Sequence, residues 1–282
     1  MTSETLIFTM YSPDQPGIVY AVTGLLASVG GNILESQQYN DAATDRFFIR
    51  IKANVPGGRS TIEAAFAQLA ANFQMTFTIS EAPRPTRTLI MASKEAHCLS
   101  DLLTKQHDGR LPIEIAGVVS NHEILRPLAD FYKADYFHIP ITKETKAAAE
   151  EKLLEIIEER KVELVVLARY MQIISPELCE KLAGSIINIH HSFLPSFKGA
   201  RPYAQAHARG VKLIGATAHY VTSDLDEGPI IEQDVVRVYH DDTPADLAVK
   251  GAEVERQVLS RAVRWHAEHR ILLNGTRTVI FN

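Results

Sequence analysis

Short apolar runs alternate with segments of helical spacing along most of the chain after residue 87, and this alternation constrains the fold more than any other feature. Parallel strands need a crossover connection, usually a helix, so alternating strand and helix signals predict a wound, largely parallel sheet. Strands are expected at 88–92, 113–119, 136–139, 164–167, 185–189, 215–221, 230–238 and 279–281, and helices at 97–106, 125–132, 147–158, 176–182 and 244–268. The expected fold class is α/β with a Rossmann-like sheet.

The first eighty residues follow a different order, βαββαβ. This order is typical of a ferredoxin-like sandwich, in which two helices cover one antiparallel sheet of four strands. Strands are expected at 6–11, 32–39, 47–53 and 76–80, and helices at 18–29 and 61–72.

Pro83 and Pro85 separate the two patterns. Each proline removes a backbone donor and pushes the preceding residue toward an extended conformation, which suits a linker. The chain is therefore expected to contain two domains, 1–82 and 88–282, joined by residues 83–87.

The composition of the 282 residues argues against several classes of protein. Hydrophobic residues make up 46% and charged residues 22%, and no apolar run approaches the roughly twenty residues that span a bilayer. A net charge of -5 argues against nucleic acid as a partner. The first residues lack a basic segment followed by a long apolar stretch, so a cytoplasmic protein is expected. Cys98 and Cys179 form no C-x-x-C pattern and are expected to be buried thiols.

Polar residues follow the apolar run at 185–189 and recur about thirty residues later. Open α/β sheets place their ligands at the carboxyl edge of the strands, so Asn188, His190 and Asp226 are the expected catalytic residues. An Asn amide donates hydrogen bonds to a developing oxyanion without changing charge, and His titrates near neutral pH. An Asp carboxylate can hold the imidazole, orient water or relay a proton.

The motifs Asn-Ile-His, Ser-x-Leu-Pro and Leu-Asp-x-Gly-Pro resemble those of the folate-dependent formyltransferase fold over about residues 88 to 240. The longer runs 190–203 and 215–221 are most similar to one branch of this family, the formyltetrahydrofolate deformylases. The resemblance implies hydrolysis of 10-formyltetrahydrofolate to formate and tetrahydrofolate, with the folate as substrate and no separate cofactor. It also implies that the formate supplies purine synthesis and that the reaction balances the one-carbon folate pools.

The same resemblance places the folate beside the catalytic residues. Met171, Gln172, Ile173 and Ile174 are the expected pterin contacts, with the loop 222–226 opposite them. An alternative is that Met171 and Ile173 are ordinary core residues. His191 and Ser192 are also expected at the substrate, although each can instead be structural. The transferases commonly carry proline at the position of His191, so a histidine there is compatible with a role in handling water.

The segments Asp14-Gln15-Pro16-Gly17-Ile18-Val19 and Gly30-Gly31-Asn32-Ile33 resemble the ACT domain over about residues 5 to 80. This resemblance implies an amino-acid effector held through Asp14, Gly17 and Asn32, and a homo-oligomer, because such modules commonly pair. The alternative is a purely structural or dimerising module, in which Asp14 and Asn32 only cap helices and turns.

Water is the expected acceptor of the formyl group. Transferases of this fold cradle a phosphate on a glycine-rich turn after the first strand, whereas residues 91–99 here read Met-Ala-Ser-Lys-Glu-Ala-His-Cys-Leu. The alternatives are formyl transfer to an amine bound near His219 or Arg201, and a non-catalytic amino-acid-responsive protein.

A metal site at His190, His191, His219 and Asp226 is not expected, because the spacing matches no known signature. Adjacent histidines on an extended chain also point to opposite sides.

Overall fold

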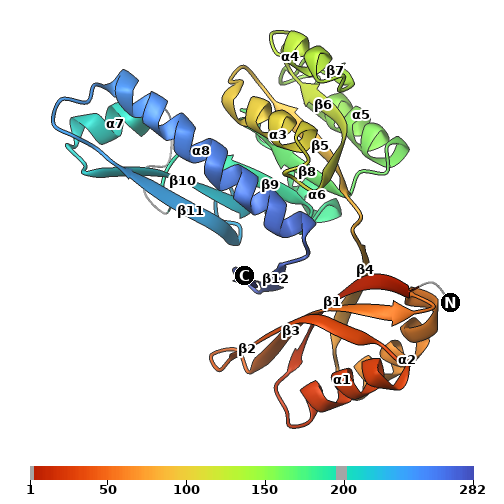
Figure 1. Cartoon of the computed structure of the whole chain (residues 1–282). Coiled ribbons are helices and arrows are strands. Elements are labelled where there is room, and N and C mark those ends of the chain that lie inside the picture. The colour runs from red at the N-terminus through yellow and green to blue at the C-terminus, as the bar shows by residue number, and fades with distance from the viewer. Residues whose placement is uncertain (1–2, 195–201) are drawn as a thin grey trace. The chain divides into compact units, whose positions relative to one another are not determined.

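The computed structural model describes residues 3–194 and 202–282, and the chain divides into two compact units (Figure 1). The first unit comprises Met1–Arg84 with Glu268–Asn274 and Val279–Asn282, and the second comprises Pro85–Ala267 with Gly275–Thr278. The change of unit at Arg84 lies in the expected linker, of which Thr86 and Arg87 already belong to a strand. The C-terminal segments, expected in the second domain, cluster instead with the first unit.

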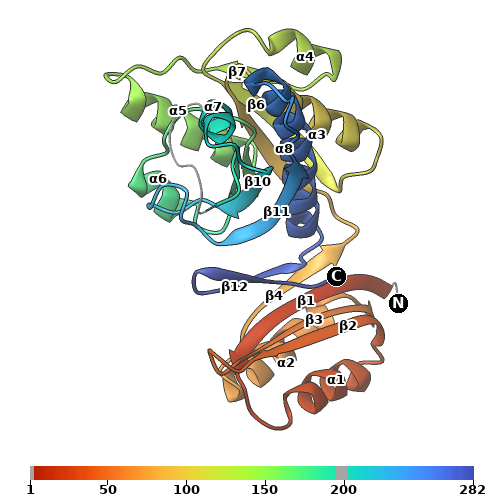
Figure 2. The same cartoon turned by 90° about the vertical axis from the view of Figure 1, so that its left-hand side faces the viewer.

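The first unit contains a four-stranded antiparallel sheet with both helices on one face (Figure 2). The strand order is β2-β3-β1-β4, as expected for a ferredoxin-like βαββαβ unit. Apolar residues four apart, such as Ile18, Val22 and Leu26, make the buried side of the first helix. The elements are β1 (Ser3–Pro13), α1 (Ile18–Ser28), β2 (Asn32–Asp41), β3 (Arg46–Pro56), α2 (Arg59–Asn72) and β4 (Thr76–Ala82).

A C-terminal hairpin of β12 (Ile271–Asn274) and β13 (Arg277–Ile280) packs on the other face of this sheet. Successive residues of β3 point to opposite faces, so Ile49 packs in the core under the helices while Phe48 contacts Leu272 and Phe281. The side chain of Asn274 donates to the Asp41 carboxylate at 2.6 Å. The expected strand near 279–281 is present, whereas β12 was not expected from the sequence.

The second unit contains a seven-stranded sheet in the order β11-β10-β9-β8-β5-β6-β7. The pairs from β7 to β9 are parallel, whereas β10 is antiparallel to β9 and to β11. The expected mostly parallel wound sheet is therefore confirmed. The strands are β5 (Thr86–Ala92), β6 (Ile113–Ser120), β7 (Tyr136–His138), β8 (Leu164–Leu167), β9 (Ile186–His190), β10 (Leu213–Tyr220) and β11 (Ile230–Arg237).

Helices cover both faces of this sheet, and the strand order indicates where a ligand would bind. One face packs against α5, and α8 lies along β9, β10 and β11 beside α3 (Figure 1). The chain winds from β5 outward to β7 and returns to β8, so the order reverses between β5 and β8, where such sheets bind ligands. The helices are α3 (His97–His107), α4 (Arg126–Phe131), α5 (Lys146–Glu159), α6 (Pro176–Lys181), α7 (Pro202–Ala208) and α8 (Pro244–Ala267).

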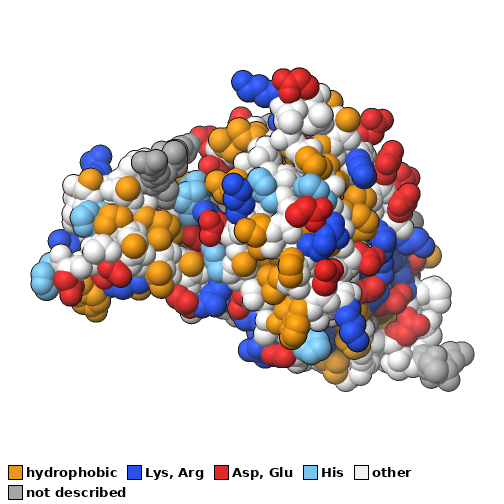
Figure 3. Space-filling view, turned by 90° about the horizontal axis from the view of Figure 1, so that it is seen from above, with side chains coloured by type: hydrophobic (Ala, Val, Ile, Leu, Met, Phe, Trp, Pro, Cys, Tyr) orange, Lys and Arg blue, Asp and Glu red, His pale blue; other side chains and the backbone are white. Residues whose placement is uncertain are grey.

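The charged side chains and the helices of the described residues agree with the expectations drawn from the composition. Acidic and basic side chains are interspersed on the face seen in Figure 3, which also carries histidines. Within residues 3–194 and 202–282, none of the helices has both the length and the apolar character needed to cross a membrane. Cys98 and Cys179 are both buried free thiols, as expected.

The hairpin contact provides a test of the fold. Leu272→Ala is expected to lower the free energy of unfolding of the first unit by about 2–3 kcal/mol, because Leu272 is only 7% exposed against Phe48. Leu273→Ala is the matched control, since Leu273 is 39% exposed, and a change of at most about 0.5 kcal/mol is expected. Hydrogen exchange of the β3 amides measures both, and equal effects of the two variants would contradict the packing described here.

Candidate active site

The end of β9 places two polar side chains on one face of the sheet. Asn188 and His190 are two residues apart and therefore point the same way, while Ile187 and Ile189 are buried on the other face. The neighbouring strand β10 runs antiparallel and sets His219 directly opposite Asn188. Opposed residues of an antiparallel pair have their side chains on the same face, so His219 joins this group.

The loop between β10 and β11 brings Asp226 to the same point. Its Oδ1 lies 3.3 Å from Nδ1 of His190 and 3.7 Å from Nε2 of His219. Asp226 has a φ of 57°, a left-handed conformation that Asp adopts more readily than most residues. The structure therefore brings the three expected catalytic residues, Asn188, His190 and Asp226, together around His219.

His219 orients Asn188, a role that the sequence analysis missed. Nδ1 of His219 lies 2.9 Å from the carbonyl oxygen of Tyr220, which can only accept, so Nδ1 carries a proton. In the neutral ring Nε2 therefore accepts a hydrogen bond from Nδ2 of Asn188, at 3.3 Å. One amide hydrogen is fixed in this way and the second remains for a ligand. The signal for this pairing is the antiparallel register of β9 and β10, which local sequence patterns do not reveal.

The charges at the site favour an ionised Asp226. The hydrogen bond from His190 and, second, the nearby ring of His219 hold the pKa of Asp226 well below its usual value although partial burial opposes this. Because a carboxylate accepts and does not donate, Nδ1 of His190 carries the proton that faces Asp226. Nε2 of His190 is buried and has no hydrogen-bond partner in the part of the chain that the structure describes. His190 itself lines the cleft, beside Asn188 and His191.

His191 stacks on His190, with ring centroids 5.2 Å apart and an interplanar angle of 22°. The expectation that the two rings point to opposite sides is wrong, because β9 ends at His190 and the strand alternation does not extend to His191. Burial, with smaller contributions from Arg169 and His190, lowers the pKa of His191 to about 4. His191 is therefore a neutral imidazole at pH 7 and can accept a proton.

A cleft of about 260 Å³ opens beside these side chains. Met171 and Ile173 are 58% and 62% exposed, so they are not core residues. The backbone N–H of Met171 donates to Oγ of Ser93 at 3.0 Å, which ties the segment after β8 to the end of β5. The walls comprise the segment 169–174 with Leu167 and Cys179, residues 188–191 with His219, and the loop 221–226.

The expected substrate residues differ in where they lie. Met171, Gln172, Ile173, Ile174 and His191 all line the cleft. Ser192 is buried, and its backbone oxygen accepts a hydrogen bond from the Thr217 hydroxyl at 3.0 Å. It is not among the described lining residues. Arg201, considered for an amine pocket, lies outside the described residues.

The expected effector residues of the first unit are exposed but lie at opposite ends of its sheet. Asp14 follows Pro13, which pairs with Arg46 of β3, whereas Asn32 pairs with Asn54. Eight residues of a strand span roughly 26 Å. One chain therefore does not bring Asp14 and Gly17 together with Asn32.

The neutral state of His191 provides a test by pH. Since its folded pKa lies below the ordinary 6.5, the unfolded chain takes up the proton first, and stability is lost as the pH falls toward about 4. Between pH 7 and pH 5 the Tm of the wild type is expected to fall by about 3 °C more than that of His191→Asn. Exposed His240→Gln is the control and is expected to behave as the wild type. Parallel curves for all three proteins would exclude a depressed pKa.

Comparisons with known proteins follow the two units. A family model described as Formyl transferase matches residues 86–263, and one described as ACT domain matches residues 4–80. The chain is 50% identical over 277 residues to a formyltetrahydrofolate deformylase of Corynebacterium sp. (strain P-1), covering 97% of both chains. It is 48% identical to that of Bacillus subtilis (strain 168), covering 96% of this chain and 91% of the relative.

A solved structure also matches along the chain. The crystal structure of a formyltetrahydrofolate deformylase from Pseudomonas syringae pv. tomato matches with a TM-score of 0.97 and 43% identity. The match covers 100% of this chain and 96% of that one.

Proposed function

The chain belongs to the formyltetrahydrofolate deformylase family, and on this basis we propose that it hydrolyses 10-formyltetrahydrofolate to formate and tetrahydrofolate. The observation that carries the proposal is the contact of Asp226 with His190 at a cleft that also has apolar walls, among them Met171, Ile173 and Ile174. An apolar slot with a few polar groups suits a flat heteroaromatic ring. The folate is the substrate, and the proposal includes no separate cofactor and no metal.

The reaction adds water to the formyl carbon and then breaks the bond from that carbon to N10 of the folate. The water loses a proton to a base, the carbonyl electron pair moves to oxygen, and N10 takes up a proton as it leaves. Formate then carries both oxygens, and the net reaction releases one proton.

Asn188 and His190 stabilise the oxygen of the formyl group in this proposal. The second amide hydrogen of Asn188 can donate to this oxygen, and Nε2 of His190 donates to it when the ring carries a proton on both nitrogens, with Nδ1–H held by Asp226. Donors aimed at a developing oxyanion act strongly because they need no reorganisation during the reaction. Asp226 holds His190 through Nδ1, and its carboxylate can relay the proton that N10 requires.

His191 handles the water. It is the neutral imidazole of the site and lies against His190, so it can take the proton that the attacking water loses. This assignment favours a water-handling role for His191 over a purely structural one.

Transfer to an amine is the second candidate. An amine pocket at His219 is disfavoured, because both nitrogens of that ring contact protein groups, Tyr220 and Asn188. The deformylase relatives also cover nearly the whole chain.

We further propose that the second unit is catalytic and the first is regulatory, responding to an amino acid. Asp14 and Gly17 of one copy would face Asn32 of a second copy, which requires a homo-oligomer. A controlled hydrolase in the cytoplasm would supply formate for purine synthesis and balance the folate pools.

Loss of the carboxylate is the first test. Asp226→Asn is expected to lower kcat by about 10²–10⁴-fold, because a neutral amide can accept a hydrogen bond from His190 but supplies no negative charge and relays no proton. Formate release from 10-formyltetrahydrofolate without any amine is the measurement. Exposed Asp241→Asn is the matched control and should keep full activity. If formate appears only when an amine is added, the result would contradict hydrolysis and favour transfer of the formyl group to an amine.

The pairing of Asn188 with His219 gives a second test. Asn188→Ala is expected to lower kcat by about 10²–10³-fold with little change in KM. His219→Ala is expected to lower kcat by about 10–100-fold, because Asn188 loses its orientation. The double variant should be no slower than Asn188→Ala, since residues that act as a unit are not additive. Full additivity of the two losses would show that His219 acts independently of Asn188.

A further inference from the structure

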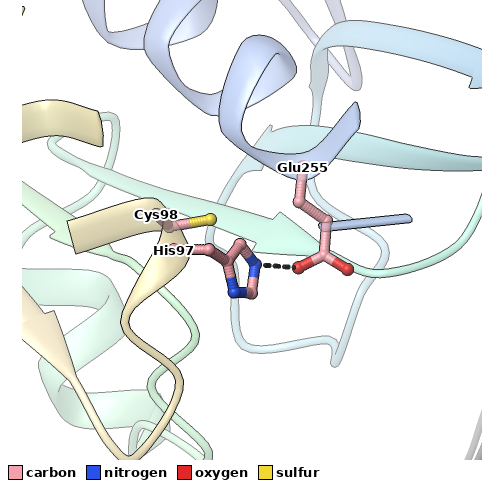
Figure 4. Close-up of side chains that lie close together, drawn as sticks. All are labelled: His97, Cys98 and Glu255. Atoms are coloured by element: carbon pink, nitrogen blue, oxygen red, sulfur yellow. Dashed lines mark hydrogen bonds and ion pairs between the residues drawn. The ribbon is translucent and has the colours of Figure 1, made fainter. Parts of the chain in front are cut away.

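A buried carboxylate lies beside the cleft and does not belong to the catalytic group. Glu255 of α8 is 2% exposed, and its Oε2 lies 2.8 Å from Nε2 of His97 at the start of α3 (Figure 4). The hydroxyl of Tyr203 donates to Oε1 at 2.6 Å. Gly251 permits this approach, because a Cβ there would collide with the Tyr203 hydroxyl. The packing of α7 and α8 thus holds Glu255 in one position.

Glu255 also faces a cation. Nε of Arg169 lies 3.5 Å from Oε2. Burial alone would raise the pKa of Glu255, but the hydrogen bond from His97, the charge of Arg169 and the bond from Tyr203 bring it below the usual value. Glu255 is therefore a carboxylate paired with the Arg169 guanidinium.

This charge balance argues against a metal at the same place. His97, Cys98 and Glu255 offer ligand atoms within 4.8 Å of one another (Figure 4). Burial, however, holds the pKa of the Cys98 thiol well above its usual value, so Cys98 remains protonated. The cation of Arg169 already neutralises Glu255. The cluster is thus built to hold a guanidinium.

Arg169 is a charged residue in the wall of the cleft. It follows β8 with a φ of 63°, lines the cleft, and its side chain is 14% exposed. Its Nη1 is buried and has no hydrogen-bond partner among residues 3–194 and 202–282. A buried charged donor without an acceptor is costly and calls for an explanation, of which a ligand is one.

The neighbours of Arg169 place this donor close to the chemistry. His191 stacks on His190 and lies 6.4 Å, between ring centroids, from Tyr203, which bonds Glu255. Contacts therefore run continuously from Asp226 through the two histidines to Glu255 and Arg169. Arg169 is also the foremost charged group acting on His191.

We propose that Arg169 is the anion-recognising residue of this hydrolytic site, with Nη1 donating to the oxygen that water contributes, first in the tetrahedral adduct and then in formate. The proposal rests on the function proposed above. Hydrolysis yields a carboxylate with two oxygens, of which Asn188 and His190 take the one from the formyl group. The planar guanidinium of Arg169 suits the second oxygen of the carboxylate, which comes from water. The same cation repels an alkylammonium acceptor, so it favours water over amines. Glu255, His97 and Tyr203 are positioning residues.

The test measures binding of formate, separately from turnover. Sodium formate is titrated into the protein saturated with tetrahydrofolate, and its Kd is obtained by calorimetry. Arg169→Gln is expected to weaken formate at least tenfold while the Kd of tetrahydrofolate stays within twofold. Arg169→Lys keeps the positive charge but loses the planar guanidinium, so a loss of formate affinity between those of the wild type and Arg169→Gln is expected. Unchanged formate affinity in Arg169→Gln would overturn the proposal.

The positioning residues are tested by turnover. Glu255→Gln and Tyr203→Phe are expected to lower kcat and to weaken formate, with KM for the folate unchanged. Tyr203→Phe removes a single hydrogen bond and keeps the test valid if Glu255→Gln fails to fold. Glu253→Gln is the matched control, since Glu253 is exposed on the same helix. A fall in kcat for Tyr203→Phe with wild-type formate affinity would count against positioning of Arg169.

The two proposals fail in different ways. If Asp226→Asn abolishes hydrolysis while Arg169→Gln binds formate normally, the deformylase mechanism stands and the role of Arg169 falls. If Asp226→Asn retains full activity, the mechanism itself falls, and with it the role of Arg169 that rests on it.

Discussion

The pairing of Asp226 with His190 is the interaction on which the rest of the site depends. A carboxylate with a strongly lowered pKa fixes the proton on one ring nitrogen and leaves the other for the substrate. The sheet supplies the rest, since β10 pairs antiparallel with β9 and sets His219 against Asn188. The antiparallel pair thus sets Asn188 beside His219, and Asp226, a loop residue with positive φ, completes the group.

The cleft is organised by two carboxylates with different partners. Asp226 holds an imidazole, whereas Glu255 pairs with a guanidinium. Between them lie two stacked histidines, of which His191 is kept neutral mainly by burial. A carboxylate, two imidazoles and a guanidinium therefore follow one another along a short series of contacts, which suits the proposed reaction because it takes up and releases protons.

The sequence predicted most elements because their patterns are local. The apolar run at 164–167 coincides with β8, and the expected 147–158 helix differs from α5 by one residue at each end. Asn188, His190 and Asp226 were also found from motifs. The role of His219 was missed because it depends on the register between two strands, which the pattern of either strand alone does not contain. Likewise, β12 is short, and only its contact with Phe48 explains its position.

The discontinuous first unit has a consequence for biosynthesis. Leu272 and Phe281 are translated long after Phe48, yet they cover the sheet face on which Phe48 lies. Domains usually fold in the order in which they are translated. The amino-terminal module therefore lacks this cover on Phe48 until Leu272 and Phe281 have emerged, so products of translation truncated before these residues would expose that apolar surface.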